Sequence, residues 1–200
     1  IEITTDIKKV ISSTDNIVLV IPSAFVEKSL QGLSPNDFEN KNIISATKGI
    51  IPSTNQIVAD FLQSQFNVEL ERQAVLSGPS HAEEIAQDGM TYLTIGAHNP
   101  QFANELAKRF ACRFVKTRTS SDIRGIEYSA VLKNIYALVA GISKGAGYGD
   151  NFISVLISNA AQEMQRFLNT IDPNNERDTN NLVYLGDLLV TAYSQHSRNR

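Results

Sequence analysis

The sequence predicts an α/β fold in which a doubly wound sheet is followed by an all-helical region. Three observations lead to this prediction. Apolar strand patterns alternate with helical patterns in the first part of the chain, as expected for a parallel sheet. No strand pattern recurs beyond residue 121, where helical periodicity takes over. The 200 residues are 42% hydrophobic and 20% charged, which suits ordinary globular domains with buried cores.

The chain is expected to begin with two strand-helix units. A short strand is predicted at 1–5, and Asp6 is predicted to cap the first helix. The run NIVLVI at 16–21 is apolar from residue 17 onward, which predicts a strand buried on both faces. A helix ending near Gly32 follows, and the next strand is predicted at 42–46.

A third unit is expected to bring three strand ends together. The helix after the strand at 42–46 carries apolar positions at 57–62, and the strand of the third unit is predicted at 73–76. In doubly wound sheets, ligands bind outside the carboxyl ends of the strands. These ends carry Pro-Ser at 22–23, Thr-Lys at 47–48 and Ser-Gly-Pro-Ser at 77–80. Small residues, backbone donors and one cation together favour a crevice for an anionic ligand.

The third strand end has two interpretations. Ser80 followed by Glu83 matches a capping box at the start of a helix predicted over 81–87. In the first interpretation, Ser80 only caps this helix. In the second, the helix N-terminus behind Gly78 offers free N–H groups to an anion. Lys48 also has two interpretations, since a lysine at a strand end is either simply exposed or part of a ligand site.

Two further strands and a helix precede the predicted domain boundary. The strands are predicted at 90–95 and 112–116, and the helix at 100–110, with a proline in its first turn. The polar segment 117–121 is the predicted boundary because the strand pattern ends there. The predicted domains are residues 1–118 and 119–200.

The helical region is organised around the segment 125–151. Its periodicity predicts a core-facing stripe formed by Val131, Ile135, Leu138 and Ile142. Lys133 lies on the other side of the helix, among Ala130, Ala137 and Ala140. If that side is also buried, Lys133 is desolvated and its pKa is lowered; otherwise the lysine extends from the alanine face into solvent. Further helices are predicted at 152–168 and 182–193, with a polar loop at 171–181.

Composition and charge exclude several classes of protein. The formal charge of −3 comes from 18 basic and 21 acidic residues, which gives no electrostatic basis for binding nucleic acid or an anionic membrane. The single cysteine, Cys112, excludes an internal disulfide, and the three histidines lack metal-ligand spacing. No apolar run is long enough to span a membrane. These features predict a soluble, cytoplasmic protein without a metal site.

Five segments, taken together, resemble one enzyme family. They are ATKGI at 46–50, SGPSHAEEIA at 77–86, EYSAVLKNIYALVAGISKGAGYGDN at 127–151, LGDLLVTAYS at 185–194 and SRNR at 197–200. In this order and spacing they resemble bacterial-type NAD(P)-dependent glycerol-3-phosphate dehydrogenase along nearly the whole chain. The resemblance implies a partial Rossmann-like, NAD(P)-binding domain followed by a helical substrate-binding domain. It also implies the interconversion of sn-glycerol 3-phosphate and dihydroxyacetone phosphate, which supplies phospholipid synthesis.

The resemblance also assigns roles to individual residues. Lys133 would accept and donate the proton of the C2 oxygen, which agrees with a desolvated lysine of lowered pKa. The other implied substrate-binding residues are Lys48, Gly78, Ser80, Asn134, Asp187, Thr191, Ser197, Arg198 and Asn199. The implied cofactor-binding residues are Phe25, Lys48, Ala82 and Arg198, and the cofactor would be NAD or NADP.

Parts of the family pattern are absent or altered in this chain. Its first GxGxxG unit and the helices after SRNR do not occur, so the chain is predicted to be a central fragment with an uncovered sheet edge and little activity alone. Without that first unit, the sequence does not distinguish NAD from NADP. The polar loop 171–181 and the pair Val183-Tyr184 depart from the glycine-rich form common in the family.

Two alternatives to this function remain open. The first is another dehydrogenase of similar plan that acts on a hydroxy acid or a sugar acid. The second is a binding module that has lost turnover. The resemblance also makes a homodimer possible as the assembled state.

Overall fold

The first part of the molecule is a sheet with helices on both faces. The structure, a computed structural model, describes residues 2–173, 175 and 177–194. Within them, five strands form one sheet in the order β1-β2-β3-β4-β5. The strands are β1 (Asn16–Leu19), β2 (Asn42–Ser45), β3 (Gln73–Ser77), β4 (Thr91–Ala97) and β5 (Val115–Ser120). Strands β1 to β3 are parallel, as the three strand-helix units predict, whereas β4 runs antiparallel to β3 and parallel to β5.

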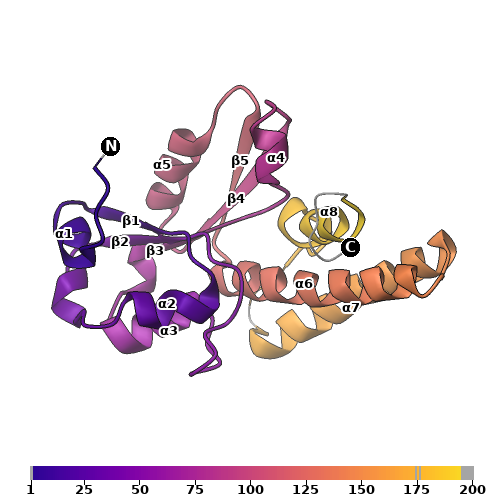
Figure 1. Ribbon diagram of the computed structural model, residues 1–200, viewed down its shortest axis with the longest axis horizontal. Coiled ribbons are helices and arrows are strands. Elements are labelled where there is room, and N and C mark those ends of the chain that lie inside the picture. Colours follow the sequence, from indigo (N-terminus) through magenta and orange to yellow (C-terminus); the bar gives the residue numbers. More distant parts are fainter. Residues whose placement is uncertain (1, 174, 176, 195–200) are drawn as a thin grey trace.

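Helices cover both faces of this sheet, as in a doubly wound fold (Figure 1). The helices and turns of this part are α1 (Ile7–Ser12), α2 (Ser23–Ser29), η1 (Pro35–Phe38), α3 (Val58–Phe66), η2 (Leu70–Arg72), α4 (Ala82–Ile85) and α5 (Pro100–Phe110). Neighbouring residues of β2 point to opposite faces. Ile43 packs in the core under α1, α2 and α3, and Ile44 packs in the core under α5.

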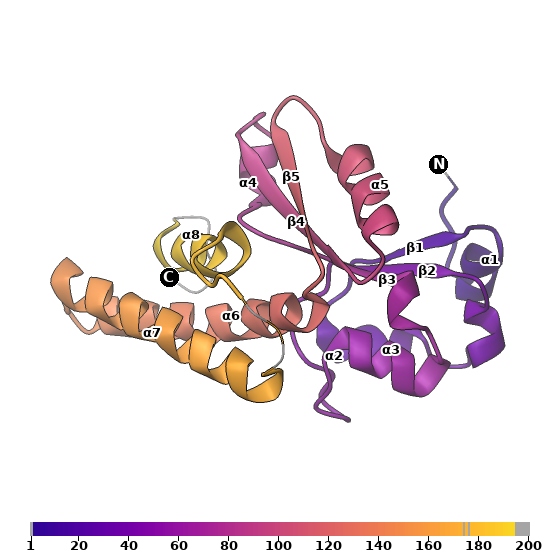
Figure 2. The same ribbon diagram turned by 180° about the vertical axis from the view of Figure 1, so that it is seen from behind.

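The second part is entirely helical among the described residues. It consists of α6 (Ile123–Gly145), α7 (Asp150–Ile171), a π-helical turn (Leu182–Gly186) and α8 (Asp187–Tyr193). Helices α6 and α7 form an antiparallel pair, and α8 lies against α6 near the sheet (Figure 2). One apolar core joins these helices to the sheet region through Ile57, Ala59 and Val75.

The sheet differs from the sequence prediction at its two ends. Residues 2–5 do not form a strand. Strand β1 was predicted to be buried on both faces, but its residues are alternately exposed and buried, and Val18 is 46% exposed. Pattern alone could not show this, because an apolar run looks the same whether or not a neighbouring element covers it. The last strand begins at Val115, three residues later than predicted, and includes polar Thr117 and Thr119 because only alternate positions face a core.

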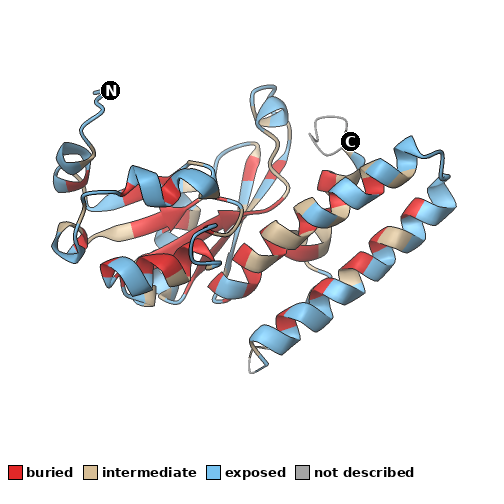
Figure 3. Ribbon diagram, turned by 60° about the horizontal axis from the view of Figure 1, so that its bottom comes forward, coloured by how far each residue is buried: buried red, intermediate tan, exposed pale blue. Residues whose placement is uncertain are grey.

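Helix α6 buries the opposite face from the one predicted. The apolar stripe is largely exposed, with Ile135 and Leu138 at 52% and Ile142 at 64%. The buried face is formed by the alanines and Lys133. Small side chains let α8 approach closely, and Figure 3 shows the exposed residues along the outer sides of α6 and α7.

Two findings concern what the described residues do not contain. No helix among them is long and apolar enough to cross a membrane. Likewise, no group of three or more His, Cys, Asp or Glu side chains in this part of the chain is placed to hold a metal ion.

Candidate active site

The carboxyl ends of β1 and β2 are joined into one surface. The Thr47 hydroxyl donates to the carbonyl of Ile21 at 2.9 Å, which ties the segment after β2 to the segment after β1. Gly49 has φ +133°, and a Cβ there would lie 2.3 Å from the Ser23 hydroxyl oxygen. Only glycine therefore allows this close approach. The loop places Lys48 at the same edge of the sheet.

The loop after β3 also depends on a glycine. Gly78 has φ +123°, and a Cβ there would lie 2.6 Å from the carbonyl oxygen of Tyr92 at the start of β4. The predicted capping box is wrong, because the Ser80 hydroxyl donates to the carbonyl of Gly78 at 3.1 Å instead. Helix α4 is only four residues long, and its N-cap, His81, makes no side-chain capping bond.

The centre of the site is a buried ion pair between α6 and α8. Lys133 is 3% exposed and Asp187 is 2% exposed, and the ammonium Nζ contacts Asp187 Oδ2. The Ser77 hydroxyl, at the end of β3, donates to the same carboxylate oxygen at 3.4 Å. Thr191 donates to the carbonyl of Asp187 at 2.6 Å. The ion pair thus lies where the helices meet the end of the sheet.

Burial sets the protonation behaviour of Lys133. Desolvation lowers the pKa of Lys133 to about 8, although the charge of Asp187 acts in the opposite direction. The nearby ammonium of Lys48 contributes to this lowering by like-charge repulsion. The desolvated interpretation of Lys133 is therefore confirmed, and the solvent-extended one is wrong. A lysine with a pKa near neutrality can exchange a proton with a bound ligand.

The family is decided by models of known protein families. The model "NAD-dependent glycerol-3-phosphate dehydrogenase N-terminus" matches residues 1–103. The model "NAD-dependent glycerol-3-phosphate dehydrogenase C-terminus" matches residues 122–200. The chain belongs to the NAD-dependent glycerol-3-phosphate dehydrogenase family. The resemblance inferred from the five sequence segments is thereby confirmed.

Individual members of the glycerol-3-phosphate dehydrogenase family agree with this assignment. Glycerol-3-phosphate dehydrogenase [NAD(P)+] of Fusobacterium nucleatum is 34% identical over 201 residues, covering 100% of this chain and 59% of that protein. The Oceanobacillus iheyensis protein of the same name is 38% identical, covering 98% of this chain and 56% of its own length. This chain therefore spans less than two thirds of the relatives it matches.

Solved structures of this family share the fold. The crystal structure of glycerol-3-phosphate dehydrogenase from Coxiella burnetii superposes with a TM-score of 0.87 at 26% identity, covering 97% of this chain and 58% of that one. A structure from Dunaliella salina superposes with a TM-score of 0.88 over 98% of this chain and 34% of that one; at 24% identity it supports the fold alone.

The remaining predicted site residues lie around this centre or outside the described part. Asn134 is half-buried, and its amide donates to the carbonyl of Ala130 at 3.0 Å. Phe25 on α2 is 57% exposed, and Ala82 on α4 is also exposed. The predicted phosphate-binding residues Ser197, Arg198 and Asn199 lie outside the described residues.

Two residues of the site region are absent from the sequence-based prediction. Ser77 reaches Asp187 from β3, and its place at the start of the Ser-Gly-Pro-Ser segment was the available signal. Glu127 is 4% exposed on α6, and its carboxyl accepts the Ala59 N–H at 3.0 Å at the start of α3. Burial raises the pKa of Glu127 to about 8. A lone glutamate in a helix carries no signal of burial in one sequence.

Proposed function

We propose that this chain, joined to the terminal segments that its relatives possess, interconverts sn-glycerol 3-phosphate and dihydroxyacetone phosphate with NAD or NADP. This joined form is called the extended protein below. The observation that carries the proposal is the buried Lys133–Asp187 pair beside Lys48, at the carboxyl ends of the strands, in a chain of this family. In cells, the reduction would supply glycerol 3-phosphate for phospholipid synthesis.

Lys133 is the proposed acid and base of the reaction. In the reducing direction its ammonium donates a proton to the C2 oxygen, and in the oxidising direction its amine accepts one. Asp187 fixes the position of Nζ and favours the ammonium form. Lys48 adds a second positive charge at the same place, which stabilises negative charge that develops on the C2 oxygen.

The other predicted residues are proposed to hold the two ends of the substrate. Gly78 and Ser80 contact it from the loop after β3, and Asn134 and Thr191 from the helices. Ser197, Arg198 and Asn199 bind its phosphate, for which a guanidinium offers two parallel donors. Energy from binding the distant phosphate serves to orient C2 at Lys133.

The strand ends fit a bound dinucleotide. When bound, the nicotinamide would supply the hydride acceptor or donor. Gly49 and Gly78 allow the Ser23 hydroxyl and the Tyr92 carbonyl to pack closely against the loops after β2 and β3, which keeps these strand ends compact. The proposed cofactor contacts are Lys48, Phe25, Ala82 and Arg198.

The test is oxidation of NADH and NADPH with dihydroxyacetone phosphate, run on this chain and on the extended protein. Activity in the extended protein only is the expected result. Activity in neither would overturn the proposal, and the assay would then be repeated with 2-oxo acids and oxidised sugar acids as substrates. Competition between dihydroxyacetone phosphate and these carboxylates distinguishes a phosphate site from a carboxylate site.

Arg198→Ala tests the phosphate contact in the extended protein. Removing one charge-assisted pair is expected to raise the KM for dihydroxyacetone phosphate about 10- to 100-fold with a smaller effect on kcat. Arg200→Ala is the matched control two residues away. An unchanged KM in Arg198→Ala would remove Arg198 from the phosphate site.

The domain division, cellular location and assembly remain part of the proposal. We propose domains at 1–118 and 119–200, a cytoplasmic location and a homodimer. The exposed apolar stripe of α6 supports coverage by another segment or a second copy. Light scattering of the extended protein measures its oligomeric state directly.

A further inference from the structure

A second buried polar cluster lies behind the site, at the beginning of α6. Asp122 is 6% exposed and caps α6 by accepting the Gly125 N–H at 2.9 Å. The same carboxylate accepts Arg177 Nε at 2.5 Å and Arg177 Nη2 at 3.0 Å, and it contacts the Tyr184 hydroxyl. The amide of Asn175 adds a bond at 2.9 Å. None of these groups takes part in the proposed proton transfer.

Arg177 extends this cluster to the end of α7. Its side chain is 1% exposed. Its Nη1 donates to the carbonyls of Leu168 and Asp172 at 3.1 and 2.9 Å, and its Nη2 donates to the Asp172 carboxylate at 2.5 Å. One guanidinium therefore fixes the beginning of α6 to the end of α7. The hydrogen bonds and two carboxylates compensate the cost of burying its charge.

The cluster closes a ring of contacts that includes the ion pair of the site. Asp122 caps α6, the helix that carries Lys133. Lys133 contacts Asp187, the first residue of α8. The π-helical turn Leu182–Gly186 leads directly into Asp187 and contains Tyr184, whose hydroxyl returns to Asp122. The position of Asp187 is thus coupled to the cap of the helix that holds its partner.

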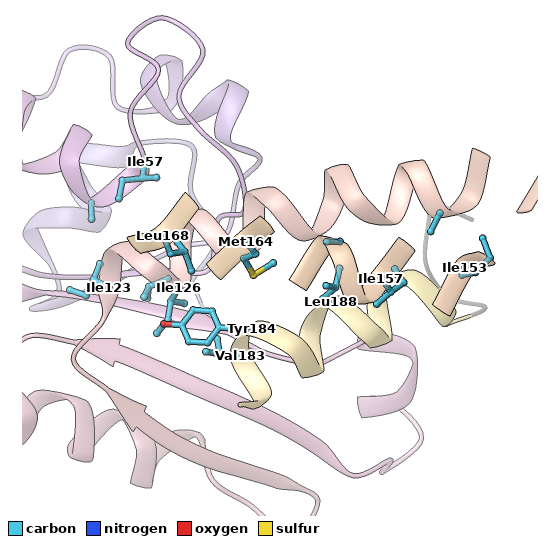
Figure 4. Packing of buried hydrophobic residues seen from close by; sticks show 14 residues of the cluster. Ile57, Ile123, Ile126, Ile153, Ile157, Met164, Leu168, Val183, Tyr184 and Leu188 are labelled. Carbon is cyan, nitrogen blue, oxygen red and sulfur yellow. The ribbon is translucent and has the colours of Figure 1, made fainter. Parts of the chain in front are cut away.

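The π-helical turn Leu182–Gly186 is held to α6 by packing as well as by this polar bond. Such turns are rare and often occur at functional sites. Val183 and Tyr184 are each 3% exposed and pack in the core shared with Ile126 and Met164. Figure 4 shows Tyr184 beside Ile126 of α6. The Tyr184 hydroxyl is the polar connection from this turn to α6.

We propose that Asp122, Arg177 and Tyr184 form a positioning network that holds Asp187 against Lys133. This inference rests on the proposed function for its kinetic part, because Lys133 is assigned there as the acid and base. Tyr184 acts through the turn, and Arg177 acts by holding Asp122 charged and in place.

Tyr184→Phe in the extended protein tests the network by removing one hydroxyl. We expect kcat for dihydroxyacetone phosphate to fall about tenfold, while the KM changes less than about twofold. The pKa of Lys133 is expected to fall when Asp187 is held less firmly, because the charge of Asp187 raises this pKa whereas the charge of Lys48 lowers it. It is measured by NMR titration of the lysine side chain and by the pH profile of kcat. Tyr136→Phe, a half-buried tyrosine of α6 in the same core, is the matched control.

The outcomes separate this inference from the proposed function. If the extended protein is inactive, the proposed function fails, and the NMR titration still decides the network. An unchanged Lys133 titration in Tyr184→Phe overturns the network whether or not the protein is active. A loss of thermal stability with unchanged titration and pH profile also overturns it, because Tyr184 would then only support the core.

Arg177 provides a second, independent variant. Arg177→Met leaves Asp122 buried without its cation, and it is expected to lower both kcat and the pKa of Lys133. Arg177→Lys keeps the charge and is expected to restore part of both. If Arg177→Met unfolds the protein, the Tyr184→Phe result stands alone as the test. Equal titration of Lys133 in Arg177→Met and the parent protein would contradict the proposal.

Discussion

Lys133 and Glu127 are both buried side chains of α6, but they point to different neighbours. Both are almost fully buried, at 3% and 4% exposure. Lys133 contacts the carboxylate of Asp187, whereas the carboxyl of Glu127 accepts the N–H of Ala59. The nearby cation Arg124 binds Asp60 instead, at 2.9 Å. Within the part of the chain that the structure describes, Lys133 therefore has a counter-charge and Glu127 does not.

Burial shifts the pKa values of Lys133 and Glu127 in opposite directions. Desolvation disfavours the charged form of each group, so it lowers the pKa of Lys133 and raises that of Glu127, both to about 8. At neutral pH, Lys133 remains mostly charged while Glu127 remains mostly a neutral acid. Lys133 can thus donate a proton to a ligand, and Glu127 is suited to joining α6 to α3.

The largest test of this difference is the loss of the amine itself. Lys133→Met in the extended protein removes the proposed acid and base and should lower kcat by about 10³-fold, with little change in KM. Lys144→Met, at the exposed end of α6, is the control. Steady-state kinetics with dihydroxyacetone phosphate measure the effect. A variant with near-normal turnover would show that another group transfers the proton.

The next test makes Lys133 resemble Glu127 by removing its counter-charge. Asp187→Asn leaves a buried ammonium without a partner, which should cost about 3–5 kcal/mol of unfolding free energy at pH 7. The unfolded state then binds a proton more tightly than the folded state, so stability should rise as the pH rises toward the ordinary lysine pKa. Urea denaturation across this range measures it.

The double variant Lys133→Met/Asp187→Leu is the control for that experiment. Removing both charges should recover most of the lost stability, because well-packed apolar groups often replace a buried ion pair without loss. If Asp187→Asn were as stable as the parent protein, the pair would contribute nothing to folding. The comparison with Glu127 would then have no energetic basis.

The sequence predicted the fold better than it predicted which faces are buried. The strand-helix alternation and the 100–110 helix follow from local patterns, and the structure confirms them. The exposed face of β1 and the exposed stripe of α6 were wrong because periodicity identifies an apolar face but not the element that covers it. Lys133 could be recognised as a candidate site residue from the sequence, because a charged side chain is unusual on a helix side that is otherwise formed by alanines.

The network around Asp122 could not be predicted, for a physical reason. Asp122 is more than fifty positions from both Arg177 and Tyr184, with which it forms hydrogen bonds. Each residue alone looks like an ordinary helix cap, loop arginine or core tyrosine. Only the fold brings their charges and hydroxyl together. The same holds for Ser77 and Asp187, whose contact spans 110 positions.

The smallest test concerns Glu127 and uses pH. In the folded protein the pKa of Glu127 is raised to about 8, above its ordinary value of 4.5. Between these values the folded state keeps a proton that the unfolded state releases, so this group lowers stability as the pH rises through that window. Below 4.5 both states are protonated and the penalty is absent.

Glu127→Gln should remove this dependence, because an amide carries no charge but can still accept the Ala59 N–H. We expect the variant to match the parent protein near pH 5 and to be more stable by about 1–3 kcal/mol near pH 8. Urea denaturation at both pH values measures the difference, with the exposed Glu163→Gln as the control. If the parent protein is at least as stable as Glu127→Gln at pH 8, the pKa of Glu127 is not raised, and its carboxyl carries a charge there without loss of stability. The burial of a carboxyl without a counter-charge would then not distinguish it from Lys133.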